Sequence, residues 1–224
     1  MMIVSFSGID GAGKSTQVCE LQFWLRQCGL CSKLVTFWDD VVALSRLREF
    51  MSHIAFKGDR GIGSPEKPLN RRDKNVTSWP LTTVRCFLYF ADALSLCLKV
   101  RAVTRRTTDI VIFDRYIYDE IANLPLNIGW ARLFARILLK LVPKPDIAYL
   151  IDADPAEAQA RKPEYPLGFL HCNREAYIRL AQLAGNITVI GPTSVEITQI
   201  KIRQKMLQEL STPKPGSVEL SVLP

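Results

Sequence analysis

The chain has no long run of apolar residues. A membrane-spanning helix needs roughly 20 in a row, and every apolar stretch in these 224 residues is far shorter. The N-terminus carries no basic segment and enters a strand-like run at Met2, so a cleaved signal peptide is not expected. We therefore expect a cytoplasmic protein with no membrane partner.

Histidine is scarce, with two residues in the chain, and the six cysteines follow no disulfide or metal framework. Four of the cysteines have apolar neighbours in helix-like contexts, where cysteine acts as a small hydrophobic residue, so we expect reduced thiols. Cys28 and Cys31 have the C-x-x-C spacing of redox and zinc sites. No second pair follows, and a helix ending at Gly29 explains that spacing as well. The other cysteines are Cys19, Cys86, Cys97 and Cys172.

The composition fits one globular domain with an anionic ligand. At this length, a chain that is 48% hydrophobic can bury a full core without dividing. The net charge of +7 favours polyanionic ligands, which include both nucleotides and nucleic acids.

Strand-like and helix-like segments alternate along the chain. Continuous apolar strands separated by helices are typical of a parallel sheet that is covered on both faces. The sequence therefore predicts an α/β fold with a five-stranded parallel sheet between two helical layers. Residues 57–78 read as a long exposed basic loop, and residues 211–224 as a flexible tail. The predicted strands are 2–6, 33–37, 109–113, 147–151 and 187–190, and the main predicted helices are 17–27, 41–56, 80–106, 130–141, 155–184 with a break at Pro163 and Pro166, and 195–210.

Residues 8–16 read GIDGAGKST and match the pattern G-x-x-x-x-G-K-[ST] directly after the first strand. In such a loop the glycines let backbone N–H groups surround phosphate oxygens. Lys14 can reach the β and γ phosphates, and Ser15 offers a hydroxyl to Mg²⁺ at a helix N-terminus. The expected ligand is a nucleoside triphosphate. The alternative is a glycine-rich turn that matches the pattern by chance.

Polar residues follow each of the first four predicted strands. Ligands of open parallel sheets bind at the carboxyl ends of the strands, so these residues are candidates for the site. They are residues 10–16, then Trp38, Asp39 and Asp40, then Asp114, Arg115 and Tyr116, and finally Asp152 and Asp154.

Two segments together resemble the thymidylate kinase family. Residues 6–17 look like the opening of these enzymes, and residues 111–116, VIFDRY, look like the D-R-Y segment that ends their third strand. Residues 151–155 with Arg161 resemble the approach to the family's lid, and residues 177–181 resemble the helix behind it. The resemblance covers about residues 1–210 and implies a single P-loop kinase domain with a short lid near residues 160–174.

The resemblance implies transfer of the ATP γ-phosphoryl group to dTMP or a related pyrimidine deoxynucleotide, with Mg²⁺. The expected partners are ATP and the monophosphate, and we do not expect nucleic acid. The residues expected to bind ATP are Gly8, Gly11, Ala12, Gly13, Lys14, Ser15 and Thr16, and those expected to bind the acceptor are Asp10, Arg48, Tyr89, Arg115 and Tyr116. Ser15 and Asp114 would bind the metal and its water. The expected catalytic residues are Lys14, Asp10, Arg115 and Arg161.

Four of these residues also have plain structural explanations. Arg115 can form a strand-end ion pair with Asp114 or Glu120. Asp10 can stabilise its own loop by a hydrogen bond. Tyr89 can be a core residue of an amphipathic helix, and Tyr116 can equally be a core residue.

One catalytic arginine has to come from outside the phosphate loop. In family members with an arginine inside this loop, that residue stabilises the transferring group, and here Gly11 occupies its place. The lid offers Arg161 and Arg174, with Lys162 to assist. A solvated helix face would also explain Arg161, and a pair with Glu175 would explain Arg174.

Substrate recognition departs from the family pattern. Ala93 replaces an arginine that contacts the base, Asp119 stands where a small hydroxyl is usual, and Asn123 stands where an aromatic is common. The sequence therefore does not decide which base the acceptor carries. Two other functions also remain, a kinase of another acceptor such as a nucleoside, or a nucleotide-binding protein with little turnover that docks through residues 57–78. The apolar helices at 84–98 and 130–141 would serve a homodimer or the core.

Overall fold

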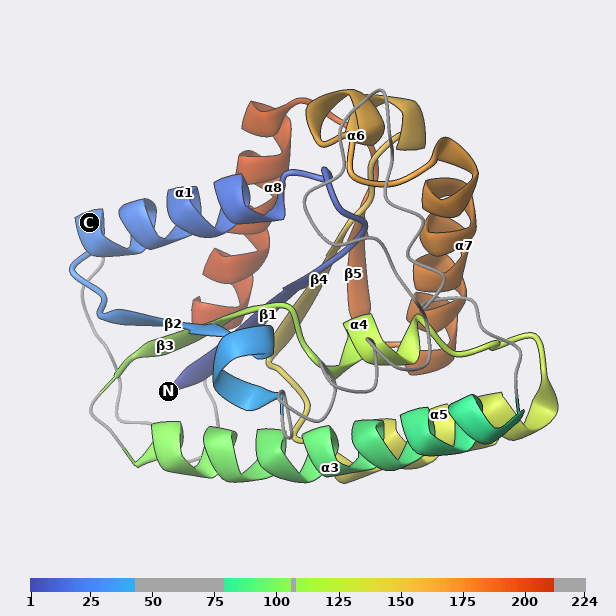
Figure 1. Ribbon diagram of the computed structural model, residues 1–224. Coiled ribbons are helices and arrows are strands. Elements are labelled where there is room, and N and C mark those ends of the chain that lie inside the picture. Colours follow the sequence, from blue (N-terminus) through green and yellow to red (C-terminus); the bar gives the residue numbers. More distant parts are fainter. Residues whose placement is uncertain (43–78, 106–107, 212–224) are drawn as a thin grey trace.

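Five parallel strands form the centre of the computed structural model, which describes residues 1–42, 79–105 and 108–211 (Figure 1). Their order across the sheet is β2-β3-β1-β4-β5. The strands are β1 (Met2–Ser7), β2 (Ser32–Thr36), β3 (Ile110–Asp114), β4 (Ile147–Ile151) and β5 (Ile187–Ile190). The predicted five-stranded parallel sheet is confirmed.

Helices cover both faces of the sheet. Figure 1 shows α1 (Lys14–Gln27) and α8 (Val195–Ser211) on one face, and α3 (Trp79–Thr104) with α5 (Gly129–Leu141) on the other. The remaining helices are α4 (Ile117–Ile121), α6 (Pro155–Arg161) and α7 (Leu167–Ala184). Among the helices that the structure describes, none is long and apolar enough to span a membrane.

Burial explains why the strands read as continuous apolar runs. Every residue of β1 and β4 is buried, because these strands have neighbours on both sides and helices on both faces. The edge strands β2 and β5 are partly exposed. The central strands therefore hold the two loops that follow them, after Ser7 and after Asp114, on a rigid base.

The structure shifts a few predicted boundaries. The first helix begins at Lys14 rather than at residue 17, and Phe37 leaves β2 to begin a short π-helix, η1 (Phe37–Val41). Phe37 is fully buried there, and the Thr36 N–H donates to the Asp40 carboxylate. The break predicted at Pro163 and Pro166 separates α6 from α7. Most of the helix predicted at 41–56, the loop 57–78 and most of the tail 211–224 lie outside the described residues.

Candidate active site

The loop between β1 and α1 is wound around the amine of Lys14. Lys14 Nζ donates to the carbonyl oxygens of Gly8 and Ile9, each at 2.8 Å. The lysine is almost fully buried, and burial lowers the pKa of its amine to about 8. Arg115 lowers this pKa further, whereas Asp10, Asp119 and Asp114 oppose the shift. The loop thus holds its cation in place before any phosphate binds.

This pKa predicts how ATP binding depends on pH. Phosphate oxygens are bound by the charged amine, which is the main form below pH 8 and is lost as the pH rises. We expect the Kd for ATP to rise by up to about tenfold per pH unit above pH 8, until the pKa of the complex is reached. Isothermal titration from pH 7.5 to 9.5 measures this. A Lys14→Met variant should show no such change, and a flat wild-type profile would contradict the expectation.

Gly11 leaves no room for a side chain. Its φ is +83°, and a Cβ built there would lie 2.2 Å from the backbone oxygen of Ala158 in α6. An arginine at this position of the loop would require α6 to move. The contact also places α6 directly against the phosphate loop.

Arg161, at the end of α6, lies over the loop. Its Nη1 is 3.7 Å from the position that a Gly13 Cβ would occupy. Its Nε donates to the Glu157 carbonyl at 3.2 Å, and its side chain stays about half exposed. Of the two lid arginines, this is the one beside the phosphate loop.

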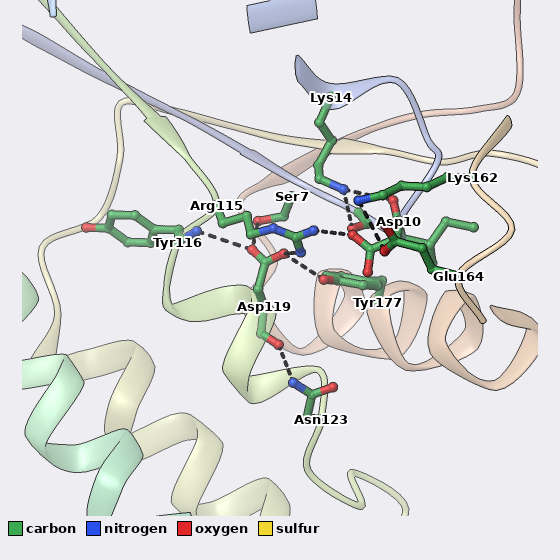
Figure 2. A network of polar contacts seen from close by, with 12 residues as sticks. Ser7, Asp10, Lys14, Arg115, Tyr116, Asp119, Asn123, Lys162, Glu164 and Tyr177 are labelled. Carbon is green, nitrogen blue, oxygen red and sulfur yellow. Dashed lines mark hydrogen bonds and ion pairs between the residues drawn. The ribbon is translucent and has the colours of Figure 1, made fainter. Parts of the chain in front are cut away.

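Arg174 and Lys162 are held by other acids. Arg174 makes two hydrogen bonds to Asp152, of 2.6 and 2.7 Å, and so joins α7 to the end of β4. Its partner is Asp152, not the Glu175 that the sequence suggested. Lys162 pairs with Glu164 at 3.3 Å, and Figure 2 shows both side chains beside Asp10 and Lys14.

Arg115 lies at the centre of a polar network at the end of β3 (Figure 2). Its guanidinium donates to Asp10 of the phosphate loop and, at 2.9 Å, to Asp119 of α4. These carboxylates raise the pKa of Arg115, so it stays charged. The ion pairs predicted with Asp114 or Glu120 are replaced by pairs with these two acids. The network brings the D-R-Y segment to the phosphate loop.

Asp119 is the residue that sequence reasoning missed as a functional group. Its side chain is 1% exposed, and both of its oxygens are bound. Besides Arg115, its partners are Ser7 Oγ at 2.7 Å, the Tyr116 N–H at 3.2 Å and the Tyr177 hydroxyl at 2.6 Å. The sequence carried only a weak signal, because Arg115 precedes α4 and the four-residue spacing to Asp119 is not a helical one.

Tyr116 joins this network through its backbone N–H, and its side chain lies elsewhere. Its ring is fully buried edge-on against Phe113, and its hydroxyl donates to the Pro143 carbonyl. Figure 2 shows the ring pointing away from Asp10 and Lys14. The ring of Tyr116 therefore fills the core, in agreement with the core explanation for this residue.

The other predicted acceptor contacts are less defined. Tyr89 and Ala93 are buried residues of α3 that belong to the hydrophobic core. This agrees with the core explanation for Tyr89. Arg48 lies outside the described residues.

The oxygen donors at the loop suit magnesium. Ser15 is exposed at the start of α1, and Asp114 ends β3, where burial raises the pKa of its carboxyl. Mg²⁺ keeps several waters and takes one or two protein oxygens plus substrate phosphates. Ser15 would ligate it directly and Asp114 would bind its water, and the ion would neutralise charge on the phosphates. Clusters of three or more potential ligands are absent from the described residues. All six cysteines lie in the described part and are free thiols.

Comparisons with known proteins agree with this geometry. No protein-family model matches the chain. A probable thymidylate kinase of Methanosphaera stadtmanae is 27% identical over 217 residues, which are 93% of this chain and 99% of that protein. The thymidylate kinase of Prochlorococcus marinus is 25% identical, with 94% and 98% covered. A probable thymidylate kinase of Pyrobaculum aerophilum is 29% identical, with 83% and 85% covered. Over most of its length, the chain is therefore similar to thymidylate kinases.

Proposed function

We propose that the protein is an ATP-dependent nucleoside monophosphate kinase that transfers the γ-phosphoryl group to dTMP or a related pyrimidine deoxynucleotide. The observation that carries this proposal is the meeting of Lys14, Asp10 and Arg115 at the ends of β1 and β3. Lys14 would bind the donor phosphates, and the guanidinium of Arg115 would bind the phosphate of the acceptor. The family relatives carry the same activity in their names.

The transfer itself requires positioning and charge more than covalent chemistry. In the proposed mechanism, the loop amides and Lys14 bind the β and γ phosphates. Arg115 holds the acceptor phosphate in line, Asp10 orients the acceptor, and Arg161 stabilises charge on the transferring group from the lid, residues 160–174. Ser15 and Asp114 would hold Mg²⁺, which would supply positive charge to the donor phosphates. We extend the proposal to one cytoplasmic domain spanning residues 1–210.

Arg115 tests the acceptor half of this proposal. We expect Arg115→Lys to lower kcat/KM for the acceptor by about 100-fold, because lysine keeps the charge but loses the planar fork. The KM for ATP should stay within about twofold. Steady-state ADP release measures both. Unchanged acceptor kinetics would remove Arg115 from the site. The lysine variant is chosen because Arg115→Ala would leave Asp10 and Asp119 without their buried cation.

We also propose that two copies pair through α3. This helix exposes Phe87, Phe90, Leu94 and Leu98, which recur three and four residues apart along one face. Phe87 and Leu98 are each 65% exposed. A contiguous apolar stripe of this kind marks an interaction surface.

The pairing is tested at Leu98. We expect Leu98→Glu to convert a dimer into a monomer in light scattering, because each copy would bury a charge in the symmetric interface. Ile200→Glu on α8, where Ile200 is 54% exposed, is the matched control and should leave the dimer intact. A wild-type monomer, or a Leu98→Glu dimer, would contradict the proposal.

A further inference from the structure

Two carboxylates share the guanidinium of Arg115, and they are held very differently. Asp119 is 1% exposed and accepts hydrogen bonds from Ser7, Tyr116, Tyr177 and Arg115. Asp10 is 12% exposed and lies in the loop that faces the donor site. One carboxylate is therefore built into the core, whereas the other lies at the open side of the arginine.

The donors to Asp119 come from separate parts of the fold. Ser7 ends β1, Tyr116 precedes α4, and Tyr177 lies in α7. Because a buried carboxylate with four donors would lose all of them on moving, Asp119 is fixed relative to the sheet. Its contact with Arg115 Nη1 therefore fixes one side of the guanidinium.

The backbone fixes the base of the same side chain. Arg115 has a φ of +70°, the only positive value among non-glycine residues of the described part. Its N–H donates to the Phe6 carbonyl at 2.9 Å. A residue other than glycine adopts this conformation at a cost, which the surrounding contacts have to offset. The strain lies at the residue whose direction matters most for binding an anion.

An anion that approaches the guanidinium competes with the carboxylate on the side from which it comes, Asp119 at Nη1 or Asp10 at Nη2. Asp119 is 1% exposed and accepts from four groups, whereas Asp10 is 12% exposed and accepts from Nη2 of Arg115. A phosphate oxygen is a comparable acceptor for that nitrogen. Replacement of Asp10 would also release its carboxylate toward the acceptor.

We propose that Asp119 is a positioning residue that anchors Arg115, and that Asp10 is an exchangeable counter-ion whose place on Nη2 an acceptor phosphate takes. This inference rests on the proposed function and adds the order of events at the acceptor site. It predicts that the two acids have opposite effects on phosphate binding. Asp10 competes with the phosphate, and Asp119 prepares the arginine for it.

Simple charge repulsion makes a different prediction. If both carboxylates acted only by repelling the acceptor phosphate, removal of either would strengthen phosphate binding. If Asp119 anchors the arginine, its removal lets the guanidinium turn fully onto Asp10 and weakens phosphate binding. The sign of the Asp119 effect therefore separates the two accounts.

Inorganic phosphate is the probe, because it has no sugar or base to contact Asp10. Its Kd is measured calorimetrically with Mg²⁺ and a saturating non-hydrolysable ATP analogue, which fills the donor site. We expect Asp10→Asn to lower this Kd about fivefold and Asp119→Ser to raise it about tenfold, as for one charge-assisted hydrogen bond. Asp40→Asn removes a half-exposed acid that pairs with Lys99, and should change nothing.

Tyr177→Phe guards against a folding defect in Asp119→Ser. It removes one donor from the same Asp119 oxygen and keeps both charges, so we expect a Kd about two- to threefold higher. A lower Kd in Asp119→Ser, or an unchanged Kd in a folded Tyr177→Phe, would overturn the inference, as would no phosphate binding to the wild type. Acceptor-dependent ADP release by the wild type is a separate measurement. If ADP release were absent, the proposed function would be refuted. The changes in phosphate Kd in the variants could still be measured and would test the inference separately.

Discussion

Lys14→Met is expected to lower the rate of ADP release by at least about 10³-fold, because it removes a preorganised cation from the transferring phosphate. Methionine keeps the length of the side chain and can fill the same buried space. It cannot donate to Gly8 and Ile9, as Lys14 does. The loss should therefore appear in turnover and in the Kd for ATP.

The matched control for this variant is Lys140→Met. Lys140 is an exposed lysine of α5 in the last turn of that helix. It should leave both kinetic constants unchanged, since it lies far from the loop in the fold. Thermal unfolding of both variants shows whether the chain is folded. A folded Lys14→Met enzyme with wild-type turnover would mean that residues 8–16 do not bind the donor phosphates.

Arg161→Ala is expected to lower kcat by about 10³-fold or more with little change in the KM for either substrate, as for arginines that act on the transferring group. Arg161 lies beside Gly13 of the loop and has no buried partner to satisfy. Arg174→Ala is the matched control. Because Arg174 is bound bidentately to Asp152, its loss should lower the melting temperature and leave most of kcat.

A double variant tests whether an arginine in the phosphate loop can replace Arg161. Gly11→Arg in the Arg161→Ala background should not restore activity, because the added Cβ would meet the Ala158 oxygen at 2.2 Å with φ at +83°. Recovery of turnover in the double variant would show that α6 can move aside. Full activity of Arg161→Ala alone would contradict the assignment of this residue.

The sheet was predictable because its central strands are buried on both faces. Apolar runs such as residues 147–151 have no polar position, which excludes an exposed face. The phosphate loop was equally clear, since its glycines and lysine have fixed spacing. Both signals are local, so one sequence carries them completely.

The network around Arg115 was not predictable in the same way. Ser7, Asp119 and Tyr177 are far apart in the chain, and only the packing of β1, α4 and α7 brings them together. Tyr116 shows the reverse case. It directly follows Arg115, but the left-handed backbone at Arg115 sends the ring into the core. Neighbours in sequence are poor guides to direction at such a turn.

The most direct test of the account is ADP release with ATP, Mg²⁺ and a panel of nucleoside monophosphates and nucleosides. The account predicts turnover that depends on the acceptor, with the highest kcat/KM for a pyrimidine deoxynucleoside monophosphate and none in Lys14→Met. A maximum for a nucleoside or another acceptor would contradict the proposed substrate. ATP binding without acceptor-dependent ADP release would contradict the kinase function itself.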